Sequence, residues 1–340
     1  MVRIALIGAG FIGKVHAANL ARHPGVEFRW LIDADEIVGR PLAERYGTNF
    51  HHDVAAALTD ELLDAVLIAT PAATHPEMIR LAAGADKAIF CEKPLGVELE
   101  QVDSCLSELA GFRRPLLIGF NRRFDPHHRA LAEAVKRGEI GQVELINITS
   151  RDPGPPPLDH LRATPGGVFY ETMCHDFDMA RWLLAEEPTE VYAAASSLLE
   201  PAVNPDRDPD TAVAVLKTSG GALCQINVSR RSVYGYDQRI EVFGSKGMLQ
   251  SGNPLPTTVR RFGAEGIRED VLMTFFTDRY RDAYRLELEH FVTVVERDGS
   301  PEISAWDGRQ CLAISLAALA SARSGRPLAL EPGGEKGRRE

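Results

Sequence analysis

The sequence predicts an α/β protein: an N-terminal Rossmann domain with a doubly wound parallel sheet, then an α+β domain with a large open, mostly antiparallel sheet. Three observations predict this fold. Apolar, strand-like runs alternate with helical segments from residue 2 to about residue 120. A glycine-rich loop directly follows the first run. After Asn121, strand-like runs follow one another without intervening helices, which is typical of antiparallel sheets.

In the first domain, short apolar runs predict buried parallel strands, and the segments between them have helical periodicity. The expected strands cover residues 2–7, 26–32, 64–70, 87–91 and 115–120. The expected helices cover residues 14–23, 36–46, 74–83 and 98–109. Gly47 and Gly84 are typical helix-ending residues, and Thr74 is expected to cap the third helix.

In the second domain, several strand-like runs alternate apolar and polar residues, as strands with one face in water do. The expected strands cover residues 143–150, 190–198, 211–218, 222–229 and 238–243. The expected helices cover residues 129–136, 170–184, 280–296 and 306–324. We therefore expect a first domain at 1–121, a second at 122–330 and a flexible tail at 331–340.

Composition excludes several classes of protein. The chain has 340 residues, 38 basic and 48 acidic side chains, and a formal charge of −10. An apolar fraction of 44% is too high for a disordered chain. A general nucleic-acid binder would need a basic face, and no apolar run approaches the roughly 20 residues that span a bilayer. We expect no nucleic-acid or membrane partner.

The five cysteines form no C-x-x-C pair, so neither a disulfide framework nor a zinc knuckle is indicated. This cysteine usage fits a reducing compartment. The first apolar run, residues 2–7, is too short for a secretory leader. The expected location is therefore the cytoplasm.

Gly8, Gly10 and Gly13 have the spacing of a dinucleotide-binding loop between a strand and a helix. The first glycine permits a tight turn, the second lets a pyrophosphate approach the backbone, and the third lets helix and strand pack closely. The helix N-terminus attracts the anion. Phe11 and Ile12 lie within the loop, so we expect them to contact the cofactor as well.

Asp33 ends the second strand, 20 residues after Gly13, where a carboxylate accepts hydrogen bonds from the ribose hydroxyls. The same carboxylate would repel a 2′-phosphate, so the expected cofactor is NAD rather than NADP. Asp35 is an alternative for the ribose contact, and Arg40 is too distant in the sequence to favour NADP. A glycine turn in a nucleotide-free sheet is the structural alternative.

Glu92, Lys93 and Pro94 follow the fourth strand, at the sheet edge where ligands bind in open α/β folds. Lys93 is a candidate to donate to a substrate hydroxyl and to stabilise negative charge on that oxygen. Glu92 and Lys93 are also expected to lie near the cofactor. The alternative is a solvated Glu-Lys pair on a surface loop.

Other strand ends carry further candidates. Thr70 ends the third strand, and Pro71 and His75 follow it. All three are expected to line the cofactor, with a loop or capping role as the alternative for His75. Asn121 and Arg122 end the first domain. They can reach a substrate there, or they are ordinary linker residues.

Glu171 and His175 are four residues apart, which places them on one helix face about 6 Å apart along its axis. Gly166 and Gly167 before them permit a sharp entry and the close approach of another molecule. Histidine takes up a proton near neutral pH, and a nearby carboxylate raises its basicity. A simple surface pair at a helix start is the alternative.

A metal site formed by Glu171, His175, Asp176 and Asp178 is a further alternative, but no other ligand cluster accompanies these residues, and we expect no metal. Asp176 and Asp178 also suit the first turn of a helix, where acids favour the dipole.

Tyr234 and Tyr236 begin a strand, where their phenols can form hydrogen bonds with a polyol. Cys174 is next to His175 but points about 100° away on the helix, so we interpret it as a core residue.

Together these motifs resemble those of the glucose–fructose oxidoreductase / inositol dehydrogenase / rhizopine catabolism family. The resemblance covers about residues 2–325. It rests on four motifs: Gly8-x-Gly10-x-x-Gly13, Ala69-Thr-Pro71-x-x-x-His75, Cys91-Glu-Lys93-Pro94, and Gly166-Gly167 before His175-Asp176. Longer segments resemble the inositol dehydrogenases within the family, at residues 119–125, 150–157, 175–181 and 234–247.

The resemblance implies NAD-dependent oxidation of a ring hydroxyl of a cyclic polyol, myo-inositol or a related inositol, in a homotetramer built on the second-domain sheets. In that reaction His175 removes the hydroxyl proton and Lys93 polarises the oxygen. Glu171 orients His175 or binds a neighbouring hydroxyl. The substrate-binding residues implied are Asn121, Arg122, Arg151, Glu171, His175, Tyr234 and Tyr236.

Glu171 departs from this resemblance, because inositol dehydrogenases typically carry aspartate there. The extra CH₂ matters, since a misplacement of about 1 Å can cost roughly a hundredfold in rate. A dehydrogenase of a monosaccharide or anhydrosugar is therefore an alternative. A non-catalytic NAD-binding sensor is another, although such proteins should lack the lysine or the histidine, and both are present.

Overall fold

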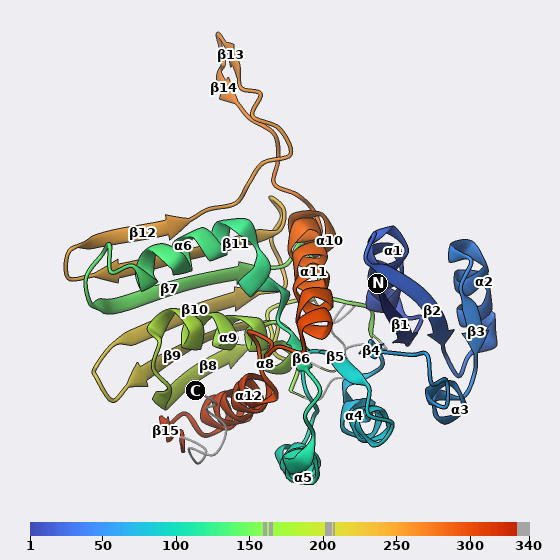
Figure 1. Cartoon of the computed structure of the whole chain (residues 1–340). Coiled ribbons are helices and arrows are strands. Elements are labelled where there is room, and N and C mark those ends of the chain that lie inside the picture. Colours follow the sequence, from blue (N-terminus) through green and yellow to red (C-terminus); the bar gives the residue numbers. More distant parts are fainter. Residues whose placement is uncertain (159–161, 163–165, 201–205, 207, 332–340) are drawn as a thin grey trace. The chain divides into compact units, whose positions relative to one another are not determined.

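The computed structural model describes residues 1–158, 162, 166–200, 206 and 208–331 (Figure 1). The chain divides into two compact units. The first contains residues 1–124 and 282–312, and the second contains residues 125–281 and 313–340. No helix of the described part combines the length and the apolarity needed to cross a bilayer.

The first unit is built on a six-stranded parallel sheet in the order β3-β2-β1-β4-β5-β6. This is the Rossmann strand order, so the predicted fold class is confirmed. The strands are β1 (Val2–Ile7), β2 (Val26–Ile32), β3 (Asn49–His51), β4 (Ala65–Ile68), β5 (Ala88–Glu92) and β6 (Leu116–Gly119). β3 was not predicted, because three residues are too few for a recognisable period.

Helices connect these strands. They are α1 (Phe11–Arg22), α2 (Glu36–Tyr46), α3 (Val54–Leu58), α4 (His75–Gly84), α5 (Leu99–Glu108), and the 3₁₀ turns η1 (Ala72–Thr74), η2 (Leu109–Gly111) and η3 (Asn121–Phe124). Gly47 ends α2 in the left-handed conformation, as predicted. The capping prediction for Thr74 was wrong, because its hydroxyl lies 2.7 Å from Oγ1 of Thr70 and donates to the Pro71 carbonyl instead.

The single boundary that the sequence predicted at residue 121 differs from the structure. Residues 282–312, which include most of α11 (Arg281–Arg297) and the start of α12 (Ala305–Ser324), belong to the first unit. The ring of Phe291 packs edge-on against Phe90 of β5, with centroids 5.6 Å apart. Helical periodicity shows that α11 has an apolar face but not which sheet that face covers. The predicted tail lies outside the described residues apart from Glu331.

The second unit contains a seven-stranded sheet in the order β12-β11-β7-β10-β9-β8-β15. β7 and β10 are parallel and the other neighbours are antiparallel, which confirms the mostly antiparallel prediction. The strands are β7 (Val143–Arg151), β8 (Pro188–Ser196), β9 (Thr211–Thr218), β10 (Leu223–Ser229), β11 (Asp237–Gly244), β12 (Gly247–Ser251) and β15 (Leu328–Ala329).

One face of this sheet is buried and the other is exposed. Buried and exposed residues alternate along residues 212–218 of β9. The helices of this unit include α6 (Pro126–Lys136), α8 (Val168–Glu171), α9 (Met173–Leu184) and α10 (Phe276–Arg279), and α9 packs on β7 and β10. A hairpin, β13 (Arg261–Gly263) and β14 (Gly266–Arg268), projects from the sheet beyond β12 (Figure 1, orange). The sequence did not predict it.

The second unit contains a buried ion pair. Nη1 of Arg279, in α10, donates to Oδ2 of Asp125 at 2.5 Å, and both side chains are 2% exposed. Asp125 also caps α6 by accepting from the N–H groups of His127 and His128. Burial alone raises the pKa of Asp125, but the hydrogen bonds from Arg279 and the facing His128 outweigh burial, so this pKa lies below its ordinary value.

Asp125→Asn leaves the guanidinium of Arg279 buried without its counter-charge. We expect the free energy of unfolding at pH 7 to fall by about 3–5 kcal/mol in urea titrations. Because the folded pKa is lowered, the ionised pair contributes fully above the unfolded pKa of about 4 and is lost as the pH falls through the folded pKa. The difference between wild type and variant in the free energy of unfolding should therefore become smaller below about pH 4.

The matched control is Asp278→Asn, which removes an exposed partner of Arg281, 3.3 Å away. This variant should lower the free energy of unfolding by less than about 1 kcal/mol. If Asp125→Asn and Asp278→Asn lower it equally, the buried pair is not important for stability.

Candidate functional site

The backbone of the glycine loop after β1 fits the dinucleotide-binding role that the glycine spacing predicts. A Cβ on Gly8, at φ +106°, would lie 2.5 Å from the Ala69 carbonyl oxygen, and a Cβ on Gly13 would lie 2.1 Å from the Gly8 carbonyl oxygen. A Cβ on Gly10 would meet nothing within 4 Å. Gly8 and Gly13 therefore permit the packing, and Gly10 leaves open space in front of the backbone.

The first turn of α1 is not capped by a side chain, since its N-cap residue is Gly10. An anion can therefore reach the N–H groups at this helix end. Within the loop, Phe11 is 58% exposed and Ile12 is partly exposed. These residues fit a bound dinucleotide.

Asp33 lies beside this loop. Its Oδ2 accepts from the Ala9 N–H at 2.6 Å, and its Oδ1 accepts from the Asp35 N–H at 2.8 Å. Asp35, the alternative for the ribose contact, instead caps α2 by accepting from the Ile37 N–H at 2.9 Å. Arg40 pairs with Glu36 at 3.3 Å. The arrangement favours Asp33 as the acid that faces the ribose.

The loop after β4 is joined to the loop after β5 by His75. This histidine is 1% exposed, and its ring nitrogens lie 2.9 Å from the Thr70 carbonyl oxygen and 2.7 Å from the Pro94 carbonyl oxygen. Burial lowers the pKa of His75, although the two carbonyls oppose this. Pro71, at the start of η1, is exposed. Cofactor contacts of these residues stay a prediction.

Glu92 and Lys93 do not form a solvated surface pair. Glu92 is 5% exposed, and its Oε1 lies 2.6 Å from Nε2 of His16. Its Oε2 accepts from the backbone N–H of Lys93 at 3.2 Å. Lys93 is half-buried, directly after the carboxyl end of β5, and its peptide bond to Pro94 is cis. His16 was not predicted as a site residue.

In the second unit, the single helix predicted over 170–184 is two helices. α8 ends at Glu171, and α9 begins at Met173. Gly166 and Gly167 have φ of +84° and +52°, which confirms the sharp entry. A Cβ on Gly167 would lie 2.0 Å from Oδ2 of Asp208, so the group that approaches this glycine is a carboxylate of the same chain.

The carboxylate of Glu171 is held by Arg230, which directly follows β10. Nη2 of Arg230 donates to Oε2 of Glu171 at 2.6 Å, and the arginine side chain is 2% exposed. Nη1 of Arg230 lies 4.0 Å from Asp208. Burial raises the pKa of Asp208 and Glu171 adds to the rise, while Arg230 opposes it. The sequence did not single out Arg230, because a basic residue after a strand is common.

His175 lies in the first turn of α9, half-buried, and the neighbouring Cys174 is 1% exposed, as predicted. Asp176 is fully buried, and its Oδ1 accepts from the Ser150 hydroxyl at 2.5 Å. Among the residues that the structure describes, no group of three or more His, Cys, Asp or Glu side chains is arranged to hold a metal ion.

The predicted substrate-binding residues form two groups. Asn121 and Arg122 are 2% and 4% exposed within η3, so they are not ordinary solvated linker residues. In the second unit, Nη1 of Arg151 donates to the Tyr234 hydroxyl at 3.2 Å, and this hydroxyl donates to Asp237 at 2.8 Å.

Tyr236 is 6% exposed, and its ring packs edge-on against Tyr280, with centroids 6.0 Å apart. Substrate contact by these residues stays a prediction.

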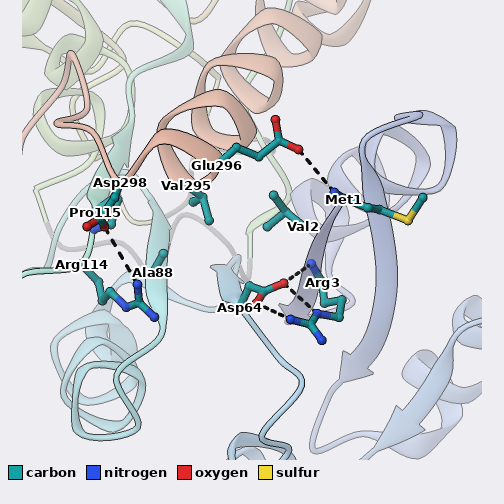
Figure 2. A pocket seen from close by; sticks show the side chains of 10 residues that line it. All are labelled: Met1, Val2, Arg3, Asp64, Ala88, Arg114, Pro115, Val295, Glu296 and Asp298. Carbon is teal, nitrogen blue, oxygen red and sulfur yellow. Dashed lines mark hydrogen bonds and ion pairs between the residues drawn. The ribbon is translucent and has the colours of Figure 1, made fainter.

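The first unit contains a cavity of about 250 Å³ that lies away from the glycine loop (Figure 2). It is lined by Val2 and Ala88, the first residues of β1 and β5, and by Arg3, whose guanidinium bonds to Asp64 at 2.8 Å. These strand starts lie at the edge of the parallel sheet opposite the glycine loop, so the cavity is not the dinucleotide site.

Two family descriptions match the chain. Residues 2–120 match "Oxidoreductase family, NAD-binding Rossmann fold", and residues 128–250 match "GFO/IDH/MocA C-terminal domain". The chain is 41% identical to inositol 2-dehydrogenase of Rhizobium meliloti over 97% of this chain and 99% of the relative. It is 42% identical to myo-inositol 2-dehydrogenase of Thermotoga maritima over the same shares.

A solved structure of myo-inositol dehydrogenase from Lactobacillus casei, in complex with NAD(H) and myo-inositol, is also similar. Its TM-score is 0.89 at 25% identity, with 98% of each chain covered.

Asp33→Ala should weaken NAD binding about 10- to 100-fold, because a hydrogen bond to a charged group contributes about 1.5–3 kcal/mol. The ratio of NADP to NAD affinity should rise at the same time, since the charge that repels a 2′-phosphate is removed. Fluorescence titration with each nucleotide measures both effects.

Asp35→Ala is the control, because it removes the cap of α2. It should lower stability by about 1 kcal/mol and leave nucleotide selectivity unchanged. If selectivity changes in Asp35→Ala and not in Asp33→Ala, the assignment of the ribose acid is wrong.

Proposed function

Because the chain belongs to the GFO/IDH/MocA family of NAD-dependent oxidoreductases, we propose that it oxidises a ring hydroxyl of myo-inositol or a related inositol to the ketone. The observation that carries this proposal is 41–42% identity, over 97% of the chain, to two proteins named inositol 2-dehydrogenases.

NAD supplies the hydride acceptor when it is bound. The chain holds it through the backbone of the Gly8–Gly13 loop, the N-terminus of α1 and the carboxylate of Asp33. Thr70, Pro71 and the segment that carries Lys93 follow the carboxyl ends of β4 and β5, where ligands bind in such sheets.

Lys93 donates a hydrogen bond to the reacting hydroxyl and stabilises negative charge as it develops on the oxygen. Its ammonium is suited to this role, because the backbone beside it is fixed by the side chain of Glu92. His175 accepts the hydroxyl proton as general base.

Glu171 orients His175 or accepts from a neighbouring substrate hydroxyl. Its bond to the buried Arg230 supports the second role, since it holds one carboxylate oxygen in a fixed place. Asn121, Arg122, Arg151, Tyr234 and Tyr236 are the further substrate-binding residues in this proposal.

A monosaccharide or anhydrosugar is the second candidate substrate, and Glu171 favours it. A glutamate there reaches one CH₂ further than the aspartate that resemblance to inositol dehydrogenases implies. The Arg230 contact anchors that longer side chain, so the pocket can be shaped for another ring.

Turnover tests the proposal. We expect NAD reduction with myo-inositol or another inositol, and a loss of at least about 100-fold in kcat for Lys93→Ala and for His175→Ala, in the range for lost charge stabilisation or general-base catalysis. A panel of inositols and sugars, followed by absorbance of reduced cofactor, measures this. Full turnover in both variants would overturn the roles, and faster turnover of a sugar than of any inositol would favour the second candidate.

We also propose a homo-oligomer, a tetramer, that covers the open face of the seven-stranded sheet. Register places Met248, Phe243, Leu145 and Leu223 directly opposite one another across β12, β11, β7 and β10. Phe243 and Met248 are 45% and 50% exposed. Leu223 is also exposed and Leu145 is half-buried. An apolar row of this kind is typical of a protein interface, and a two-fold axis would pair it with its own copy.

The β13–β14 hairpin supports a second contact of this oligomer. Phe262 and Ile267 pair across it and are 70% and 56% exposed. A two-stranded hairpin is marginally stable alone, so we expect another surface to cover it.

Phe243→Glu should break the sheet interface, because it places a charge in the middle of the apolar row. Sedimentation should show a tetramer for wild type and smaller species for the variant. Ile37→Glu, at a position 86% exposed on α2, is the matched control and should leave the mass unchanged. An unchanged mass for Phe243→Glu would contradict this interface.

A cytoplasmic location completes the proposal. All five cysteines are buried free thiols, which fits a reducing compartment.

A further inference from the structure

We propose that His16 is a positioning residue for Lys93, acting through the carboxylate of Glu92. This inference rests on the proposed function, in which Lys93 polarises the reacting oxygen. It links the helix that follows the glycine loop to the residue that contacts substrate, and all of its contacts lie within the first unit.

The histidine and the glutamate form a buried pair. Nε2 of His16, on α1, lies 2.6 Å from Oε1 of Glu92, at the end of β5. The side chains are 0% and 6% exposed. A carboxylate at this depth needs a donor, because an unpaired buried charge is strongly destabilising. The contact with His16 therefore fixes the position of the Glu92 carboxylate.

The ring of His16 is fixed in turn. It packs edge-on against Phe90, with centroids 5.3 Å apart, and against Tyr284, with centroids 5.8 Å apart. Nδ1 of His16 is buried and has no hydrogen-bond partner within the described chain. A proton on Nδ1 would be unsatisfied, so the arrangement favours the tautomer in which Nε2 donates to Glu92.

The second oxygen of Glu92 faces the catalytic segment. Oε2 accepts from the Lys93 N–H at 3.2 Å. A Cβ on Gly119, in the neighbouring β6, would lie 3.1 Å from this same oxygen, so the glycine makes room for it. The carboxylate of Glu92 thus links the imidazole of His16 to the backbone N–H of Lys93.

The other side of Lys93 is held independently. The Pro94 carbonyl oxygen lies 2.7 Å from Nδ1 of His75. With the N–H of Lys93 and the carbonyl of the next residue, Pro94, both held, the remaining freedom of the Lys93 ammonium lies mainly in its own side chain. If His16 no longer holds Glu92, the first of these two restraints is lost. A shift of about 1 Å in a catalytic group can cost roughly a hundredfold in rate.

Two substitutions separate the hydrogen bond from the packing. His16→Phe keeps an aromatic ring against Phe90 and Tyr284 but removes the donor. His16→Gln keeps an N–H donor at a similar reach but removes the ring. The control is His23→Phe, just after α1, which removes the contact of His23 with the exposed Glu289, 3.4 Å away, and the hydrogen bond that its Nδ1 accepts from the Gly25 N–H at 3.1 Å.

We expect His16→Phe to lower kcat about 10- to 100-fold, with the Kd for NAD and the KM for the polyol within about threefold of wild type. His16→Gln should recover kcat to within about fivefold of wild type, and His23→Phe should have the wild-type kcat. Acetylation of Lys93 by acetic anhydride, followed by peptide mass, should be faster in His16→Phe than in wild type and unchanged in His23→Phe. If His16 had only a structural role, His16→Phe would lower Tm, but kcat would not recover in His16→Gln and the acetylation of Lys93 would not become faster.

The proposal is overturned if folded His16→Phe has the wild-type kcat, if His16→Gln is impaired as much as His16→Phe, or if only NAD binding changes. If His16→Phe does not fold, Glu92→Gln decides, because an amide cannot accept from both His16 and the Lys93 N–H. A wild-type kcat there also overturns the proposal. If wild-type protein oxidises no inositol, the proposed function fails separately, and Lys93 acetylation still tests the positioning.

Discussion

The close approach of Gly13 to the Gly8 carbonyl is the constraint on which the first unit depends. A Cβ on Gly13 would lie only 2.1 Å from that oxygen, so α1 can start directly above the end of β1 only with glycine there. This placement leaves the Ala9 N–H for the carboxylate of Asp33 and brings His16 to Glu92. The dinucleotide loop and the segment that carries Lys93 are therefore parts of one packed arrangement.

In the second unit, too, a glycine leaves room for a group that comes close to its backbone. The carboxylate of Asp208 takes the space that a side chain on Gly167 would fill, and Arg230 lies between Asp208 and Glu171. The glycine turn thus lets two carboxylates share one buried guanidinium at the start of the segment that carries His175. In the first unit Gly119 likewise makes room for the carboxylate of Glu92, next to Lys93.

The parts of the fold that the sequence predicted well have a strong local signal. β1, β2, β4, β5 and β6 are mostly apolar runs, and α2 and α12 begin and end within one residue of the expected positions. The parts that it missed lack such a signal. β3 has three residues, the β13–β14 hairpin is exposed on all sides, and nothing local assigns residues 282–312 to the first unit. His16 and Arg230 were missed because their partners, Glu92 and Glu171, are 76 and 59 residues away in the chain.

The central claim is hydride transfer from a ring carbon of an inositol to NAD, and isotope transfer tests it most directly. The enzyme is incubated with NAD and with myo-inositol that carries deuterium on the carbon of the oxidised hydroxyl, and the reduced cofactor is examined by NMR. The account predicts that deuterium appears on C4 of the nicotinamide ring, and that turnover is slower than with unlabelled inositol if the transfer limits the rate. Loss of the deuterium to water, or formation of ketone without reduced cofactor, would contradict it.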